Sequence, residues 1–209
     1  MSEVCKGLHE KFNKMPRYRF PFNEQKVPLN GIYVLFEKGE KGHDRDRVVR
    51  VGTHTGDNQL RSRLKQHFIN ENKDGSIFRK NIGRALLNRN NDPFLGDWEL
   101  DLTTRKAKDV LSSKIDFGKQ REIEKKVSKY IQDNFSFVVF QVDDMKKRLE
   151  LESKIISSIS ACDECNASSE WLGNFSPKEK IRGSGLWLVN ELYKNELTKE
   201  EMDLLEKLS

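Results

Sequence analysis

Four side chains in this sequence have the types that phosphate chemistry needs. Arg63 and His67 are four residues apart, a spacing that places both on one face of a helix. An arginine is an always-charged fork that can bind phosphate, and a histidine can exchange a proton near neutral pH. Tyr33 adds a hydroxyl, and Glu152 adds a carboxylate that could hold one hard cation, Mg²⁺ or Mn²⁺. Together they suit metal-assisted hydrolysis of a phosphodiester bond.

The elements that must position these residues follow from the apolar pattern of the chain. Runs of β-branched and aromatic residues predict three strands, at residues 31–37, 47–53 and 135–142. Amphipathic spacing predicts helices at residues 58–70, 76–88, 118–133 and 145–160. Residues 38–46 are predicted to be the polar loop of a hairpin. This order of elements predicts a small α/β domain with a central antiparallel-type sheet flanked by helices.

Two short motifs stand on the first two predicted strands, Gly31-Ile32-Tyr33 and Arg50-Val51-Gly52. With them the chain resembles the GIY-YIG nuclease family. The first motif is intact, and the second is only partly present, because Arg50 stands where the family has the tyrosine of Tyr-Ile-Gly. The resemblance covers about residues 31–68 and 135–175, within a domain at 31–175.

The remaining sequence is predicted to lie outside the core of that domain. Residues 69–134 are an insertion, residues 1–30 are an N-terminal arm, and residues 176–209 are a C-terminal extension. The segment at 186–193 is predicted to be a strand or a helix. Thr198-Lys199-Glu200-Glu201 has the spelling of a capping box and predicts a helix from Thr198.

The helical residues of the family's site also have counterparts in this chain. Arg63 and His67 match the family's helix motif, and Glu152, within residues 149–156, matches its essential glutamate. The family has an asparagine roughly a dozen residues after that glutamate. Asn166 fits this spacing, and Asn174 is the rival.

The resemblance implies a metal-dependent endonuclease that hydrolyses phosphodiester bonds of DNA. In this reaction Tyr33 acts as the general base, Arg63 clamps the phosphate, and Glu152 binds Mg²⁺ or Mn²⁺. His67 is expected to hydrogen-bond either the Tyr33 hydroxyl or the phosphate. With one site per chain, cutting both strands needs a homodimer or two successive nicks.

The replaced second tyrosine leaves an alternative open. Arg50 cannot act as a base at neutral pH, although it could bind phosphate. His54, two residues after Gly52, could take over part of the tyrosine's role. If neither compensates, the chain is a catalytically weak or inactive nucleic-acid-binding module. A second alternative is a partner-binding protein that works through its charged C-terminal helix.

Charge is unevenly distributed along the chain. The first 90 of the 209 residues carry 19 Lys or Arg against 10 Asp or Glu, a net +9, while the rest carries 19 against 23, a net −4. A basic half favours a polyanion such as DNA, because neutralising phosphates releases counterions. We expect these basic residues of the first half to face phosphate: Arg47, Arg50, Arg61, Lys65, Arg79, Lys80 and Arg84.

Composition argues against a membrane protein. The mean hydropathy is −0.77, and no apolar run approaches the roughly 20 residues that span a bilayer. Residues 1–11 lack the apolar stretch of a secretory signal. Three cysteines do not make a disulfide framework. We therefore expect a cytoplasmic protein without a membrane partner.

Cys162 and Cys165 form a Cys-x-x-Cys motif. A structural zinc site would need two more ligands, and Cys5 and His9, the other Cys/His pair with suitable spacing, lie at the far end of the chain. A redox pair would lack the Trp-Cys-Gly-Pro context of thioredoxin-like proteins. The expectation from sequence is two reduced cysteines in a loop or in the core.

Overall fold

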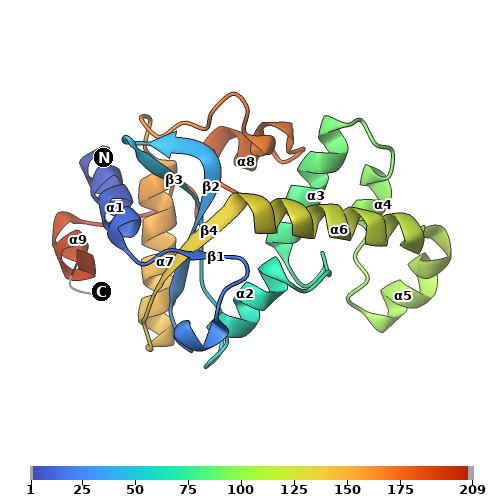
Figure 1. Ribbon diagram of the computed structural model, residues 1–209, viewed down its shortest axis with the longest axis horizontal. Helices are drawn as coiled ribbons and strands as arrows, with labels where there is room; N and C mark the ends of the chain where they lie inside the picture. The colour runs from blue at the N-terminus through green and yellow to red at the C-terminus, as the bar shows by residue number, and fades with distance from the viewer. Residues whose placement is uncertain (1, 207–209) are drawn as a thin grey trace.

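A four-stranded sheet separates two groups of helices in the computed structural model, which describes residues 2–206 (Figure 1). The strand order is β1-β4-β2-β3, and every neighbouring pair is antiparallel. The strands are β1 (Tyr18–Arg19), β2 (Ile32–Gly42), β3 (Arg45–Gly52) and β4 (Phe135–Phe140). The predicted fold class, α/β with an antiparallel sheet between helices, is confirmed.

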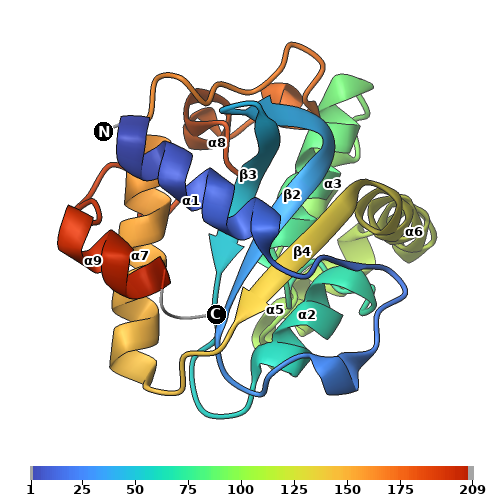
Figure 2. The ribbon, with the colours of Figure 1, turned by 60° about the vertical axis from the view of Figure 1, so that its left-hand side comes forward.

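Three helices cover one face of the sheet. They are α1 (Ser2–Lys14), α7 (Met145–Ser160) and α9 (Lys199–Glu206), which lie together at one side of the molecule (Figures 1 and 2). Alternate residues of β2, among them Val34 and Phe36, pack with Phe12 of α1 and Ile155 of α7. Asp144 caps α7, because its side chain accepts the backbone N–H of Lys147 at 2.7 Å.

Three further helices cover the opposite face of the sheet. They are α2 (Leu60–Phe68), α3 (Ile77–Arg89) and α6 (Phe117–Asn134). The intervening odd residues of β2, Tyr33 and Leu35, pack on this side with Leu64, Phe78 and Val127. The shorter helical elements are η1 (Glu24–Lys26), α4 (Leu95–Glu99), α5 (Arg105–Leu111), η2 (Ser112–Lys114), η3 (Leu172–Phe175) and α8 (Glu179–Ser184).

Some boundaries differ from those that the sequence predicts. β2 and β3 extend into the polar segment at 38–46, so that only His43 and Asp44 remain as the turn. Both have positive φ, 51° and 58°, which suits a two-residue hairpin turn that follows the twist of the strands. Residues 2–14 form a full helix, and residues 186–193 form neither a helix nor a strand. Among residues 2–206, no helix combines the length and apolar character that crossing a bilayer requires.

A β-bulge in β3 lies next to Arg50. Leu35 pairs with Arg50, but the next pair skips Val49, which is the extra residue. The freed carbonyl of Val49 accepts the N–H of Trp187 at 2.8 Å. The Arg50 guanidinium in turn donates to the carbonyl of Trp187. The bulge therefore attaches the segment around Trp187 to the hairpin, while Arg50, opposite Leu35, faces the α2 and α3 side.

Tyr33 packs directly on Gly52, its partner across β2 and β3. A Cβ at position 52 would overlap both the ring and the hydroxyl oxygen of Tyr33. Position 52 therefore accepts only glycine while Tyr33 keeps its place.

Gly52→Ala tests this constraint. We expect overpacking to lower the free energy of unfolding by about 1–3 kcal/mol and to displace Tyr33, measured by chemical denaturation. Gly96→Ala is the matched control, because a Cβ at Gly96 in α4 meets nothing within 4 Å. Equal stability of the two variants would contradict the close packing of Tyr33 on Gly52.

Candidate active site

The Tyr33 hydroxyl is the first member of a buried hydrogen-bonded chain. Its oxygen lies 2.7 Å from Nε2 of His67. His67 is on α2, four residues, or about one helical turn, after Arg63. Nδ1 of His67 lies 2.8 Å from Oγ of Ser76. Ser76 also caps α3 by accepting the N–H of Arg79 at 3.3 Å. Strand β2, α2 and α3 thus jointly fix the orientation of the hydroxyl.

His67 is neutral in this setting. Burial lowers its pKa well below the ordinary value, and the nearby charges of Arg50, Arg63 and Arg79 lower it further. A neutral imidazole has one ring nitrogen that accepts a hydrogen bond. The tautomer protonated on Nδ1 leaves Nε2 to accept from the Tyr33 hydroxyl.

Arg50 lies on the other side of the same hydroxyl. Its Nε is 3.5 Å from the Tyr33 oxygen, and its guanidinium lies over the Phe78 ring, 5.3 Å from the ring centre. Only 4% of Arg50 is exposed. The residue at the position of the family's second tyrosine therefore contacts the first one.

Glu152 comes from the middle of α7, on the opposite face of the sheet from α2. Its Oε1 accepts the N–H of Thr53, just beyond the end of β3, at 3.0 Å. Burial raises the pKa of Glu152, while Arg50 and the Thr53 N–H oppose that shift. The contact with Thr53 holds the carboxylate at the end of β3, next to Gly52, the strand partner of Tyr33.

Two adjoining cavities meet at Glu152. The larger, about 490 Å³, is lined by the first turns of α2, including Arg63, and by the loop after β3. The other, about 390 Å³, is lined by Arg50, Asn81 and the segment of residues 187–191. Leu149 and Glu152 line both. An arginine therefore faces the carboxylate from each side.

Sequence reasoning missed two asparagines of the second cavity. Asn190 lines it together with Glu152. Asn81 also lines it, is 1% exposed, and its Nδ2 has no hydrogen-bond partner among the described residues. The 3.6-residue period places Asn81 on the inner side of α3, but only the tertiary fold brings residue 190 to the site.

The structure places the two asparagines predicted from spacing elsewhere. Helix α7 continues to Ser160, eight residues and roughly 12 Å beyond Glu152. Asn166 follows that end, where its amide donates to the carbonyl of Asp163. Asn174 donates to the carbonyls of Ser168 and Ser169. Neither lines the cavities at Glu152.

His54 lines the larger cavity but has both ring nitrogens occupied by backbone partners. Nε2 accepts the N–H of Gly31 at 3.3 Å, and Nδ1 donates to the carbonyl of Gly56 at 3.1 Å. Burial and Arg148 lower the pKa of His54, which keeps it neutral. These contacts fit a residue that positions the loop after β3.

Four residues expected on a basic surface lie in the interior instead. Each pairs with a carboxylate, and their exposed fractions are 1%, 0%, 7% and 6%. The pairs are Arg47–Glu40, Arg79–Glu124, Lys80–Asp74 and Arg84–Glu99. Buried charges require such partners, so these side chains stabilise the fold and do not reach a bound phosphate.

Of the three other predicted phosphate contacts, Arg50 is buried beside Tyr33 and two remain at the surface. Arg61 is partly buried and donates to the backbone carbonyl of Val27 at 2.7 Å. The side chain of Lys65 is 43% exposed and pairs with Glu24 at 2.7 Å. Both lie on α2, the helix that carries Arg63, so a polyanion at that helix would meet them.

Comparison with known proteins gives one finding. A family model described as the GIY-YIG domain matches residues 3–209. Neither a curated protein nor a solved structure matches the chain.

The raised pKa of Glu152 predicts how stability depends on pH. A carboxyl whose folded-state pKa is raised contributes stability below its ordinary pKa, and loses that contribution as pH rises through the raised value. Glu152→Gln is always neutral, and its amide oxygen can still accept the Thr53 N–H. The variant should therefore gain stability relative to wild type as the pH rises above the ordinary carboxyl pKa of about 4.

Thermal unfolding across that pH range, without added divalent cations, measures the difference. Glu150→Gln on the exposed side of α7 is the matched control. A difference between Glu152→Gln and wild type that stays constant with pH would contradict burial as the dominant influence on this carboxyl.

Proposed function

The chain belongs to the GIY-YIG family, and on that premise we propose that it is a metal-dependent endonuclease that hydrolyses phosphodiester bonds of DNA. One observation carries this proposal. Glu152 lines one cavity with Arg63 and the adjoining one with Arg50, and Arg50 also contacts the buried Tyr33 hydroxyl that neutral His67 holds from its other side. The family gives the nuclease type of function, and these contacts support its assignment to particular residues.

Glu152 suits the single carboxylate ligand of Mg²⁺ or Mn²⁺. One of its oxygens is held by the Thr53 N–H, so the carboxylate is oriented while its second oxygen has no partner in that contact. Mg²⁺ near phosphates usually keeps several waters and takes one or two carboxylates. When bound, such an ion supplies charge neutralisation at the phosphate and at the leaving oxygen.

Arg63 would clamp the scissile phosphate in the larger cavity. Its Nη1 donates to Gln66 at 2.8 Å and to the carbonyl of Gly75 at 3.2 Å, which fixes the fork while its other nitrogens remain for a ligand. Gln59, just before α2, provides no side-chain cap, and the N–H of Leu60 donates to the carbonyl of Leu29. The next backbone N–H groups of α2 therefore add positive potential for an anion in the same cavity.

Tyr33 would be the general base that takes a proton from the attacking water. Arg50 donates to the phenol oxygen from one side, and the hydrogen bond to His67 fixes the direction of the hydroxyl from the other. His67 acts as a positioning residue, because its own protonation is opposed by burial and three arginines. Where the family has a second tyrosine hydroxyl, this chain therefore has the guanidinium of Arg50, which contacts the hydroxyl of Tyr33.

The same exchange supports a second candidate function. Arg50 is tied to the carbonyl of Trp187 and stacked on Phe78, so it cannot move freely to a substrate. If a second hydroxyl is indispensable, the chain is a weak or inactive GIY-YIG-like module that binds nucleic acid. Binding without cleavage distinguishes this candidate from the endonuclease.

Cleavage of supercoiled plasmid DNA with Mg²⁺ or Mn²⁺ tests the endonuclease. We expect metal-dependent nicking or cutting by wild type, and a loss of about 100-fold or more in Glu152→Gln, as for removal of a group that stabilises transition-state charge. Glu150→Gln, on the same helix, should cut like wild type. Linear product that rises with the square of protein concentration would indicate a homodimer.

Two results would count against this function. Equal cutting by Glu152→Gln and wild type would exclude Glu152 as the metal ligand. No cutting by wild type on plasmid, branched DNA or RNA, with binding retained, would instead support the inactive binding module.

A further inference from the structure

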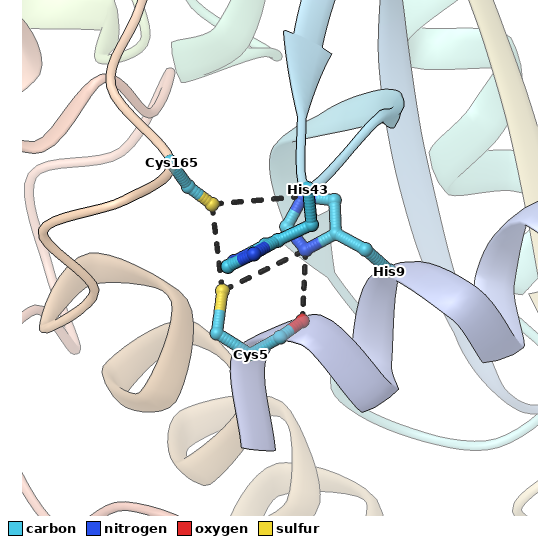
Figure 3. Close-up of side chains that lie close together, drawn as sticks. All are labelled: Cys5, His9, His43 and Cys165. Carbon is cyan, nitrogen blue, oxygen red and sulfur yellow. Dashed lines mark hydrogen bonds between the residues drawn. The ribbon is translucent and has the colours of Figure 1, made fainter. Parts of the chain in front are cut away.

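A second cluster of polar side chains lies at the far end of the β2–β3 hairpin from Tyr33. Figure 3 shows Cys5 and His9 on α1, His43 in the hairpin turn and Cys165 after α7 converging on one point. Cys5 and Cys165 belong to the core on the α1 and α7 face of the sheet, whereas Tyr33 belongs to the core on the α2 and α3 face. We propose that the cluster is a structural Zn²⁺ site.

The distances between the side chains match a tetrahedral metal site. One donor atom from each of Cys5, His9, His43 and Cys165 lies within 4.8 Å of every other. The sulfurs of Cys5 and Cys165 are 3.4 Å apart. Zn²⁺ binds sulfur at about 2.3 Å and imidazole at about 2.0–2.1 Å, which places tetrahedral ligands roughly 3.3–3.8 Å from one another.

Cys162 offers a fifth donor. Its sulfur lies 3.4 Å from Nε2 of His43, and the two-residue spacing from Cys165 is common among zinc-binding cysteine pairs. Three thiols and two imidazoles therefore compete for the four positions of a closed zinc site.

Hydrogen bonds at His9 decide between these donors. Its Nε2 accepts the N–H of Val48 at 3.1 Å, and its Nδ1 then donates to the carbonyl of Cys5 at 2.9 Å. Neither ring nitrogen has a free electron pair without breaking one of these bonds. The assignment that preserves them makes Cys5, His43, Cys162 and Cys165 the ligands, with His9 as the support that orients Cys5 and β3.

The surroundings favour zinc over a hard cation. Cys5 and His9 are 0% exposed, and Cys165 is 6% exposed. Thiolates and imidazoles select Zn²⁺, whereas Mg²⁺ prefers oxygen ligands. Gly42 leaves room for this arrangement, since a Cβ there would lie 3.3 Å from the Cys165 sulfur and 3.4 Å from Nε2 of His9. Four protein ligands leave no open position, which is typical of a structural site.

The proposed metal would join three distant parts of the chain. Cys5 and Cys165 are 160 residues apart in sequence, and His43 comes from the hairpin turn between them. Cross-linking such a long loop restricts the unfolded chain more than the folded one. The site would therefore fix α1 and the end of α7, the helix that carries Glu152, against the hairpin.

The first experiment measures the metal content of the full chain, purified without chelators and without a metal-binding tag. Elemental analysis should give one Zn²⁺ per chain, and a chelator should lower the thermal unfolding temperature. Replacement by Co²⁺ should give the visible spectrum of a tetrahedral site with three thiolates. A chain that neither contains nor takes up Zn²⁺, or that holds a disulfide between Cys5 and Cys165 instead, would overturn the proposal.

Variants then test the ligand assignment by competition with a zinc chelator. Cys162→Ser and Cys165→Ser should weaken Zn²⁺ binding by more than the roughly 10–100-fold typical of a supporting residue, and His9→Gln should stay within that range. Ser169→Ala, in the same loop, is the control. Zinc binding lost in His9→Gln but retained in Cys162→Ser would contradict the assignment. None of these measurements depends on DNA cleavage.

Discussion

The packing of Tyr33 on Gly52 is the constraint on which the candidate active site depends. The two residues are opposite each other in β2 and β3, and only the absence of a side chain at Gly52 lets the ring occupy that space. From there the hydroxyl meets His67 on one side and Arg50 on the other. Arg50 shares the face of Tyr33 because it pairs with Leu35, two residues after Tyr33 on β2.

Buried charges then hold the surrounding elements to this hairpin. Arg79 pairs with Glu124 of α6 and donates to the carbonyl of His67, so the inserted helices support the residue that orients Tyr33. Glu37 on β2 accepts hydrogen bonds from the Trp171 and Trp187 indoles, both at 2.8 Å. Burial raises the pKa of Glu37, and these donors oppose the shift. Breaking such a contact would leave a buried group unpaired, which is costly.

Capping residues and apolar spacing in the sequence predict most of the helices and strands. They do not predict which distant segments come into contact. The bounds of α7 follow from the Asp144 cap and the apolar spacing after it. No local pattern shows that Arg79 finds Glu124 or that residue 190 returns to Glu152, because tertiary packing decides both. Asn166 is predicted from its spacing after Glu152. Because α7 continues to Ser160, the chain has moved away from Glu152 before it reaches Asn166. Distance in sequence likewise made Cys5 and Cys165 look unrelated, although the fold brings them together.

We propose that the hydroxyl of Tyr33 takes the proton from the attacking water, although Arg50 stands in place of the second tyrosine. The test is the single-turnover rate of Mg²⁺-dependent DNA cleavage by Tyr33→Phe. Tyr18→Phe, at a partly buried position on β1, is the control. Removing a general base should slow cleavage by about 10²–10⁴-fold while DNA binding stays near wild type. Rates are compared below the unfolding temperature of the variant, because loss of the hydroxyl leaves Nε2 of buried His67 unpaired. Cleavage by Tyr33→Phe at the wild-type rate would contradict the account.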